Sequence, residues 1–376
     1  MPQNIKIQIN PDILTWAREE AGYKPEDIAG KLHIPTERYT HWETTGEEIP
    51  LGKVKEIATY YKRQLAVFLL PSPPPKIKKP NDYRNLAISQ VGLSHEIMMS
   101  LRRTSNYLTL AGEILGDQYW KDQYHWQIEV KNLMEKETDK NDLLINWLRN
   151  TVKIDINEQK KFRGNEEAFR KWRNSIEQEL GVFIFQFDMP EEEIDGFCYA
   201  DDKPPYAIIV NKKHAACKKI FTIFHELRHI FQHQSGICLP ESTSNVQGDE
   251  LVCNSFAGKF LVPDSEVSTV SDMTDLTQLA MQFKISREVY LRRSFEQRLI
   301  SKSDFFRLLK EIKESPIPKK KPNSKEMRIK PTVLSKSTRG ERFYNLILDA
   351  VYNNKIDYFS ASDALGMGYS YIAANE

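Results

Sequence analysis

Apolar residues recur three and four positions apart over most of the chain, which is the spacing of an amphipathic helix. Segments with this spacing lie at residues 10–70, 93–120, 139–180, 220–231, 250–261, 276–293 and 343–372. Short apolar runs, one of them alternating, instead predict strands at residues 181–187, 197–199 and 206–210. Because the last strand precedes the helix at 220–231, we expect a small sheet packed against that helix. The pattern predicts an α+β fold that is mostly helical.

Breaks in these patterns divide the chain into parts. Prolines crowd the stretch after residue 70 and predict an extended spacer, while residues 315–342 carry nine Lys or Arg against two Glu and predict an exposed linker. The expected parts are a helical N-terminal domain at 1–70, a Pro-rich linker at 71–85, a helical region at 86–180, a core around the sheet at 181–265, a helical segment at 266–312, a basic linker at 313–342 and a small helical cap at 343–376.

Short helices separated by tight turns make up the N-terminal domain. Pro25 opens one helix, His33-Ile34-Pro35 makes a turn, and Thr36 is a plausible cap for the next helix, which runs to Trp42. Two helices joined in this way form a helix-turn-helix arrangement, whose second helix commonly reads DNA. The candidate contacts to DNA or to a partner on that helix are Arg38, Tyr39, Thr40 and His41.

This domain resembles the XRE/Cro family of helix-turn-helix proteins. The resemblance is carried by Ile28-Ala29, Leu32-x-Ile34, Trp42-Glu43 and Pro50-Leu51. It implies DNA binding, but residues 1–70 hold nine Lys or Arg against ten Asp or Glu. Since phosphate neutralisation supplies most of the affinity of a duplex-binding module, the domain is expected to bind either DNA or a protein.

The most informative motif is His-Glu-x-x-His at His225, Glu226 and His229. Residues four apart share one face of a helix, so the two imidazoles can bind one Zn²⁺. Zinc lowers the pKa of bound water to about 7, and a neighbouring Glu can take its proton as the water attacks a carbonyl. The flanking residues are apolar, and two His and a Glu would be costly to bury there without a partner such as a metal. The motif predicts zinc-dependent peptide hydrolysis.

A catalytic zinc needs three protein ligands and one open position. The best candidate for the third ligand is Glu250, near the start of a helix that ends at Pro263. Asn254 lies four residues further and can orient Glu250 or a histidine by a hydrogen bond. Glu250 can also be read simply as a solvated carboxylate that favours a helix N-terminus. The less convincing ligands are Asp249, His233, Cys238 and Cys253.

Composition adds mainly exclusions. The net charge of +1 gives no global sign of a partner, and the four cysteines lack the spacing of a disulfide scaffold. The first residues lack the apolar segment of a signal peptide, and there is no run of 18 apolar residues. We therefore expect a cytoplasmic protein with reduced thiols and no membrane association.

Residues 180–263 resemble the ImmA/IrrE family of zinc metallo-endopeptidases. The motifs that carry the resemblance are Gly181-Val, the strand ending in Asn211, Phe221-Thr-x-x-His225-Glu226-Leu-x-His229 and Glu250-x-x-Cys253-Asn254-x-Phe256-Ala257-x-x-x-Leu261-x-Pro263. The resemblance implies that His225, His229 and Glu250 bind Zn²⁺ while Glu226 acts as the base. The chain departs from the family at Cys253, where Ala is usual; this small change should leave the metal undisturbed.

The resemblance also implies an activity. Members cleave an intracellular regulatory protein, such as a repressor or an antitoxin, and so control transcription or a mobile-element or stress response. Two alternatives stay open: a protease toxin of a toxin–antitoxin or phage-defence pair, and a DNA-binding regulator with a non-catalytic metal site. The candidates for stabilising the oxyanion are Tyr206, His214 and His233. Residues 276–293 resemble a second helix-turn-helix, which serves either docking or simple packing.

Overall fold

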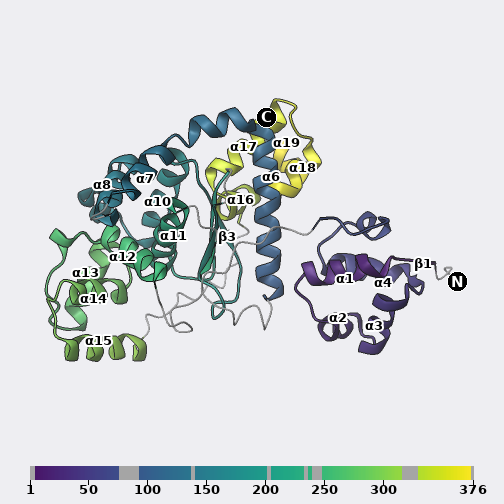
Figure 1. Ribbon diagram of the computed structural model, residues 1–376, viewed down its shortest axis with the longest axis horizontal. Helices are drawn as coiled ribbons and strands as arrows, with labels where there is room; N and C mark the ends of the chain where they lie inside the picture. The colour runs from purple at the N-terminus through teal and green to yellow at the C-terminus, as the bar shows by residue number, and fades with distance from the viewer. Residues whose placement is uncertain are drawn as a thin grey trace. The chain divides into compact units, whose positions relative to one another are not determined.

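The computed structural model describes residues 5–75, 93–136, 140–200, 205–232, 236–238, 248–315 and 329–373 (Figure 1). The chain divides into two compact units, residues 1–79 with 85–106 and residues 80–84 with 107–376. The fold is mostly helical with small sheets, as the apolar spacing predicts. Within the described ranges, no helix is long and apolar enough to cross a membrane.

The first unit is a helical bundle around one apolar core. Its elements are β1 (Lys6–Ile7), α1 (Pro11–Glu20), α2 (Pro25–Leu32), α3 (Thr36–Thr45), β2 (Ile49–Pro50), α4 (Leu51–Tyr60), η1 (Leu65–Leu69) and the beginning of α6 (His95–Gln123). The Asn10 side chain caps α1 by accepting a hydrogen bond from the Asp12 amide at 2.9 Å. His33 ends α2 in the left-handed region at φ 54°, and α3 follows Pro35, so the turn lies where the sequence predicts it.

Helix α3 corrects one expected surface contact. Tyr39 is fully buried, and its hydroxyl lies 2.5 Å from that of Tyr61 and 3.1 Å from a Glu43 carboxylate oxygen. Its ring lies beside Trp42, which is three residues away and on the same apolar face of the helix. Tyr39 is therefore unavailable to DNA or to a partner, whereas Arg38, Thr40 and His41 are exposed.

The second unit is built on a four-stranded sheet in the order β3-β5-β4-β6. The strands are β3 (Phe183–Phe187), β4 (Gly196–Tyr199), β5 (Ala207–Asn211) and β6 (Gly236–Cys238). Strands β3 and β5 are parallel, while β4 runs antiparallel to both β5 and β6. Every residue of β3, β4 and β5 is buried, as expected for a sheet covered on both faces.

Helices cover both faces of this sheet. Phe183 and Phe185 contact Phe343 of α17 (Glu341–Tyr352), and Phe185 also contacts Tyr107 of α6. On the other face, Gln186 accepts a hydrogen bond from Lys219 of α11 (Ala216–Phe231) at 2.9 Å. Figure 1 shows α10 (Asn165–Glu179) and α11 on one side of the sheet and α6 and α17 on the other. The strand pattern of alternate side chains thus separates two helical layers.

Further helices extend the layer that contains α11. They are α7 (Trp126–Met134), α8 (Lys140–Val152), α9 (Ile156–Lys161), α12 (Asp249–Leu261), η3 (Asp264–Glu266), α13 (Met273–Phe283), α14 (Arg287–Glu296) and α15 (Lys302–Glu314). The α13–α14 pair has the predicted short turn, with Lys284 at φ 61° and Ser286 capping α14. Arg293 of α14 is buried and donates to the Val262 carbonyl at 3.2 Å, so this pair packs against the end of α12.

The expected basic linker at 313–342 is wrong in its C-terminal part. Residues Pro331–Arg339 form helix α16, followed by α17, α18 (Tyr358–Leu365) and α19 (Tyr369–Ala373). Side chains of α10 and β3 hold the main chain of α16, because Arg173 and Gln186 donate to the Ser337 carbonyl at 2.5 and 2.7 Å. Backbone acceptors carry no sequence signal, so the charge count alone suggested an exposed chain.

An ion pair on α10 completes the outer edge of β3. Arg173 and Glu177 are buried and lie 3.3 Å apart. Glu177 accepts from the Ile184 amide at 3.2 Å, and Arg173 donates to the Ile184 carbonyl. Gly340 follows α16 at φ 84°, where a Cβ would lie 2.0 Å from a Glu177 carboxylate oxygen. Glycine is therefore required for α16 and α17 to pack this closely against the ion pair.

Candidate metal centre

Helix α11 carries the His-Glu-x-x-His motif against the sheet. Ile220, Phe224 and Leu227 are buried at the predicted three- and four-residue spacing. His225 and His229 are also almost completely buried, at 4% and 1% exposure. The helix therefore holds both imidazoles inside the protein, where each ring nitrogen needs a partner.

Helix α12 supplies a carboxylate to the same place. Glu250 Oε2 lies 3.1 Å from His225 Nε2, and Glu250 Oε1 lies 3.3 Å from His229 Nε2. The two Nε2 atoms are 3.2 Å apart. Ligands held about 2.0–2.1 Å from one tetrahedral ion are separated by roughly 3.3 Å. The three donors thus have the spacing that a single small divalent ion requires, and they form a potential metal cluster.

Hydrogen bonds behind the two rings fix which nitrogen faces the cluster. His225 Nδ1 lies 2.8 Å from Asn254 Oδ1, so the Nδ1–H donates and the Nε2 lone pair is left for a metal. His229 Nδ1 lies 3.7 Å from Cys253 Sγ, which is a weak acceptor. Burial raises the pKa of the Cys253 thiol and keeps it protonated. Asn254 and Cys253 therefore orient the rings from the side opposite the cluster.

Glu226 lies between the two histidines on α11. Its side chain is fully buried, and among the described residues neither carboxylate oxygen has a hydrogen-bond partner. Such a group is costly unless water, a metal or a substrate meets it. The donor set and this unpaired carboxylate fit a metal ion with an attacking water.

Strand β4 comes unusually close to this part of α11. A Cβ at Gly196 would lie 2.6 Å from Thr222 Cγ2 and 3.7 Å from Glu226 Oε1. The same Cβ would lie 2.6 Å from the Ile209 carbonyl oxygen of β5, so a side chain at position 196 does not fit between β5 and α11. The sequence alone did not reveal this requirement for glycine.

The structure favours Glu250 over the other candidates for the third metal ligand. Asp249 is exposed at the first position of α12, whereas Glu250 is 6% exposed and faces the histidines. Cys253 touches the Nδ1 side of His229, away from the Nε2 atoms, so it is not a ligand. His233 and the side chain of Cys238 lie outside the described residues.

Two predicted oxyanion stabilisers have other neighbours. The Tyr206 hydroxyl bonds to Gln127 of α7, and its amide donates to the Tyr124 hydroxyl at 3.3 Å, so Tyr206 ties α7 and the turn before it to the sheet. His214 Nδ1 lies 3.7 Å from Asp195, which itself pairs with Lys218 at 2.7 Å. Burial, and then the Lys218 charge, lower the pKa of His214, which favours its neutral form. His233, the third, lies outside the described residues.

Asn211, at the end of β5, fixes two neighbouring loops by hydrogen bonds. Its side-chain nitrogen donates to the Met189 and Ile194 carbonyls at 3.1 and 3.2 Å. Its side-chain oxygen accepts from the Lys213 amide at 3.2 Å. Asn211 therefore fixes the loop before β4 and the turn before α11, and so positions both elements that border Glu226.

Comparison with known families supports this centre. Residues 177–295, about a third of the chain, match the sequence model of peptidase family M78, described as the IrrE N-terminal-like domain. The matched segment contains His225, Glu226, His229 and Glu250. No curated protein and no solved structure matches the chain. The match and the His-His-Glu cluster together support a metallopeptidase of the ImmA/IrrE type.

Proposed function

We propose that the protein is a zinc-dependent endopeptidase that cleaves one regulatory partner protein, a repressor or an antitoxin, and thereby controls transcription or a stress response. The observation that carries this proposal is the geometry of the metal centre. His225, His229 and Glu250 place three donor atoms 3.1–3.3 Å apart, beside a buried carboxylate, that of Glu226, for which the described residues supply no hydrogen bond. Two imidazoles and one carboxylate are a ligand set of hydrolytic zinc sites.

The chain's own residues divide the chemistry between them. A zinc ion held by the three ligands would polarise the scissile carbonyl and acidify the attacking water. Glu226 accepts the proton of that water on a carboxylate oxygen and delivers it to the leaving amine. Asn254 keeps the Nδ1–H of His225 engaged, so that Nε2 stays available as a ligand.

The first unit supports a protein partner better than DNA. Arg38 and His41 on the exposed face of α3 both lie near Glu47, at 3.1 and 3.4 Å. The Arg38 charge is therefore partly neutralised within the unit, and residues 1–70 carry no excess of basic residues. We propose that this unit docks the regulatory partner and presents it to the metal centre.

Replacing Glu226 with Gln tests the proposed reaction. The variant keeps the shape of the side chain but removes the base, so cleavage should fall by about 10²–10⁴-fold. Protein N-termini labelled in cells should include new ones with the wild-type protein and lack them with Glu226→Gln. Elemental analysis should find about one zinc per chain in both proteins. Identical N-termini in both, or no zinc in the wild type, would contradict the proposal.

A further inference from the structure

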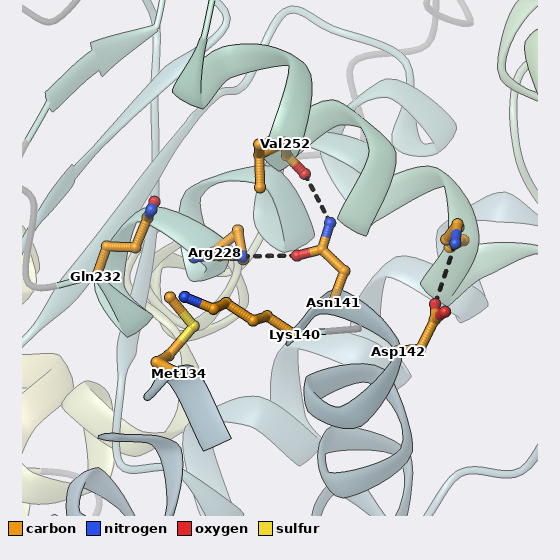
Figure 2. Close-up of a pocket in the computed structure, with 8 residues that line it drawn as sticks. Met134, Lys140, Asn141, Asp142, Arg228, Gln232 and Val252 are labelled. Carbon is orange, nitrogen blue, oxygen red and sulfur yellow. Dashed lines mark hydrogen bonds and ion pairs between the residues drawn. The ribbon is translucent and has the colours of Figure 1, made fainter. Parts of the chain in front are cut away.

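A second concave site lies at the other side of α12. Its volume is about 420 Å³, within the range of small-molecule sites, and it is bordered by α7, α8, α11 and α12. The lining residues are Met134, Lys140, Asn141, Asp142, Arg228, Gln232, Val252 and Lys259 (Figure 2). Val252 and Lys259 project from the face of α12 opposite Glu250, since they are about 160–180° from it around the helix. This pocket is therefore separate from the metal centre.

Arg228 is the unusual member of the pocket. It is 2% exposed, yet within the described ranges its one hydrogen bond is from Nε–H to Asn141 Oδ1 at 3.0 Å. Its Nη1 atom has no hydrogen-bond partner among the described residues. A buried guanidinium is normally paired with carboxylates or carbonyls because removing its charge from water is costly. The charge of Asp249 also acts on Arg228, but in the described part of the chain the two form no hydrogen bond. The unbonded guanidinium nitrogen beside the pocket therefore points to an oxyanion as a ligand.

Neighbouring side chains add to this preference. The lining carries Lys140, Arg228 and Lys259 against the single acid Asp142, and Asp142 is already paired with Lys259 at 3.1 Å. Figure 2 shows Lys140 and Arg228 extending toward the same space, with Gln232 at its border. The Gln232 side-chain oxygen is also buried without a partner in the described part of the chain. The pocket therefore offers two cations and, beside them, an acceptor for a hydrogen-bond donor.

We propose that this pocket binds a small molecule that carries a phosphate or carboxylate group next to a hydroxyl. The oxyanion accepts hydrogen bonds from the Arg228 guanidinium and the Lys140 ammonium, and the hydroxyl donates to Gln232. A planar guanidinium can hold either oxyanion through two parallel hydrogen bonds. Asn141 also donates to the Val252 carbonyl at 3.3 Å, so the occupant contacts a network that joins α8, α11 and α12.

Calorimetric titration of the full chain tests the pocket with two probes. Glycerol 3-phosphate represents the phosphate class and lactate represents the carboxylate class. We expect one of them to bind at low salt and to bind more weakly as salt is raised. Arg228→Gln should weaken that binding at least about tenfold, and Lys140→Ala should weaken it about three- to tenfold. Lys131→Ala, an exposed lysine on α7 that does not line the pocket, should leave it unchanged.

The controls separate this pocket from the metal centre. An anion that binds the metal would bind the Arg228→Gln variant as well as the wild type, and that result would overturn the proposal. So would the failure of both probes to bind. Thermal unfolding checks the fold of Arg228→Gln, and if that variant does not fold, Lys140→Ala and Gln232→Ala carry the test. Neither measurement depends on peptidase activity, so the proposed function can fail while this site stands.

Discussion

Two carboxylates with little solvent exposure, Glu43 and Glu226, have opposite surroundings. In the first unit, Glu43 accepts hydrogen bonds from Arg18 at 2.8 and 3.1 Å and from the Tyr39 hydroxyl at 3.1 Å. In the second unit, Glu226 is fully buried, and no partner for either oxygen lies within the described residues. Both lie on helices, and the Glu43 side chain is only 7% exposed, so the main difference between them is their hydrogen bonds.

The two carboxylates differ in where their hydrogen-bond partners come from. The hydrogen-bond partners of Glu43 come from the chain itself. Its bonds with Arg18 and Tyr39 hold α1 and α3 together and so contribute to stability. Glu226 has no such partner among the described residues, and a buried carboxylate in this state is usually met by water, a metal or a substrate. Arg228 Nη1 is also buried without a partner among the described residues, and there the group that could bind is an anion. In this pair, the carboxylate with partners holds two helices together, and the one without described partners lies in the candidate metal centre.

The largest effect that tests this comparison concerns the ligands themselves. Glu250→Ala removes one of three donors, and we expect zinc affinity to fall by more than the roughly 10–100-fold that loss of an outer hydrogen bond costs. Asp249→Ala is a matched control, since Asp249 is the exposed neighbour on the same helix. Zinc content after dialysis against a weak chelator measures both. If both variants lost zinc to the same extent, Glu250 would not be a metal ligand.

A direct test compares the two carboxylates by stability. Glu43→Gln removes the charge that Arg18 needs, and we expect it to lower the free energy of unfolding by about 2–3 kcal/mol. Glu226→Gln removes an unpaired buried charge, so in metal-free protein we expect no loss and a gain of about 1 kcal/mol. Urea unfolding followed by circular dichroism measures both. A similar loss in the two variants would mean that Glu226 is bonded within the fold.

The smallest expected effect is a pH dependence at His214. Burial lowers its pKa in the folded protein, so as pH falls the unfolded chain takes up the proton first. Stability is therefore lost as pH falls below about 6.5, with a slope of at most about 1.4 kcal/mol per pH unit from this group. His214→Gln should reduce the slope, whereas His125→Gln, at an exposed position, should not. Thermal unfolding between pH 5 and 7 measures it, and an unchanged slope in His214→Gln would show that His214 is not the group responsible.

The sequence predicts the metal helix well because its information is local. His225 and His229 are four residues apart among regularly spaced apolar residues, and helical geometry alone brings them together. Glu250 and Asn254 follow the same rule on a second helix, and only packing of α12 against α11 chooses Glu250 over Asp249. The spacing of residues along one helix does not predict how that helix packs against a distant one.

The errors and omissions have the same origin. Tyr39 is expected at the surface because it lies on the candidate recognition helix, but its ring packs beside Trp42 and its hydroxyl meets that of Tyr61 in the core. Helix α16 escaped prediction because its carbonyls bind side chains that lie more than 150 residues away in sequence. Gly196 was missed for a related reason, since its importance appears only when α11 crosses β4.

The ion pair of α10 has a consequence for how the molecule behaves among its own copies. Strand β3 lies at an edge of its sheet, and an open edge invites pairing with a strand of another chain. At Ile184, the amide and carbonyl that such a strand would use are occupied by Glu177 and Arg173, and α16 packs beside them. The C-terminal helices therefore protect solubility as well as shape, since they keep this edge from acting as a template for aggregation.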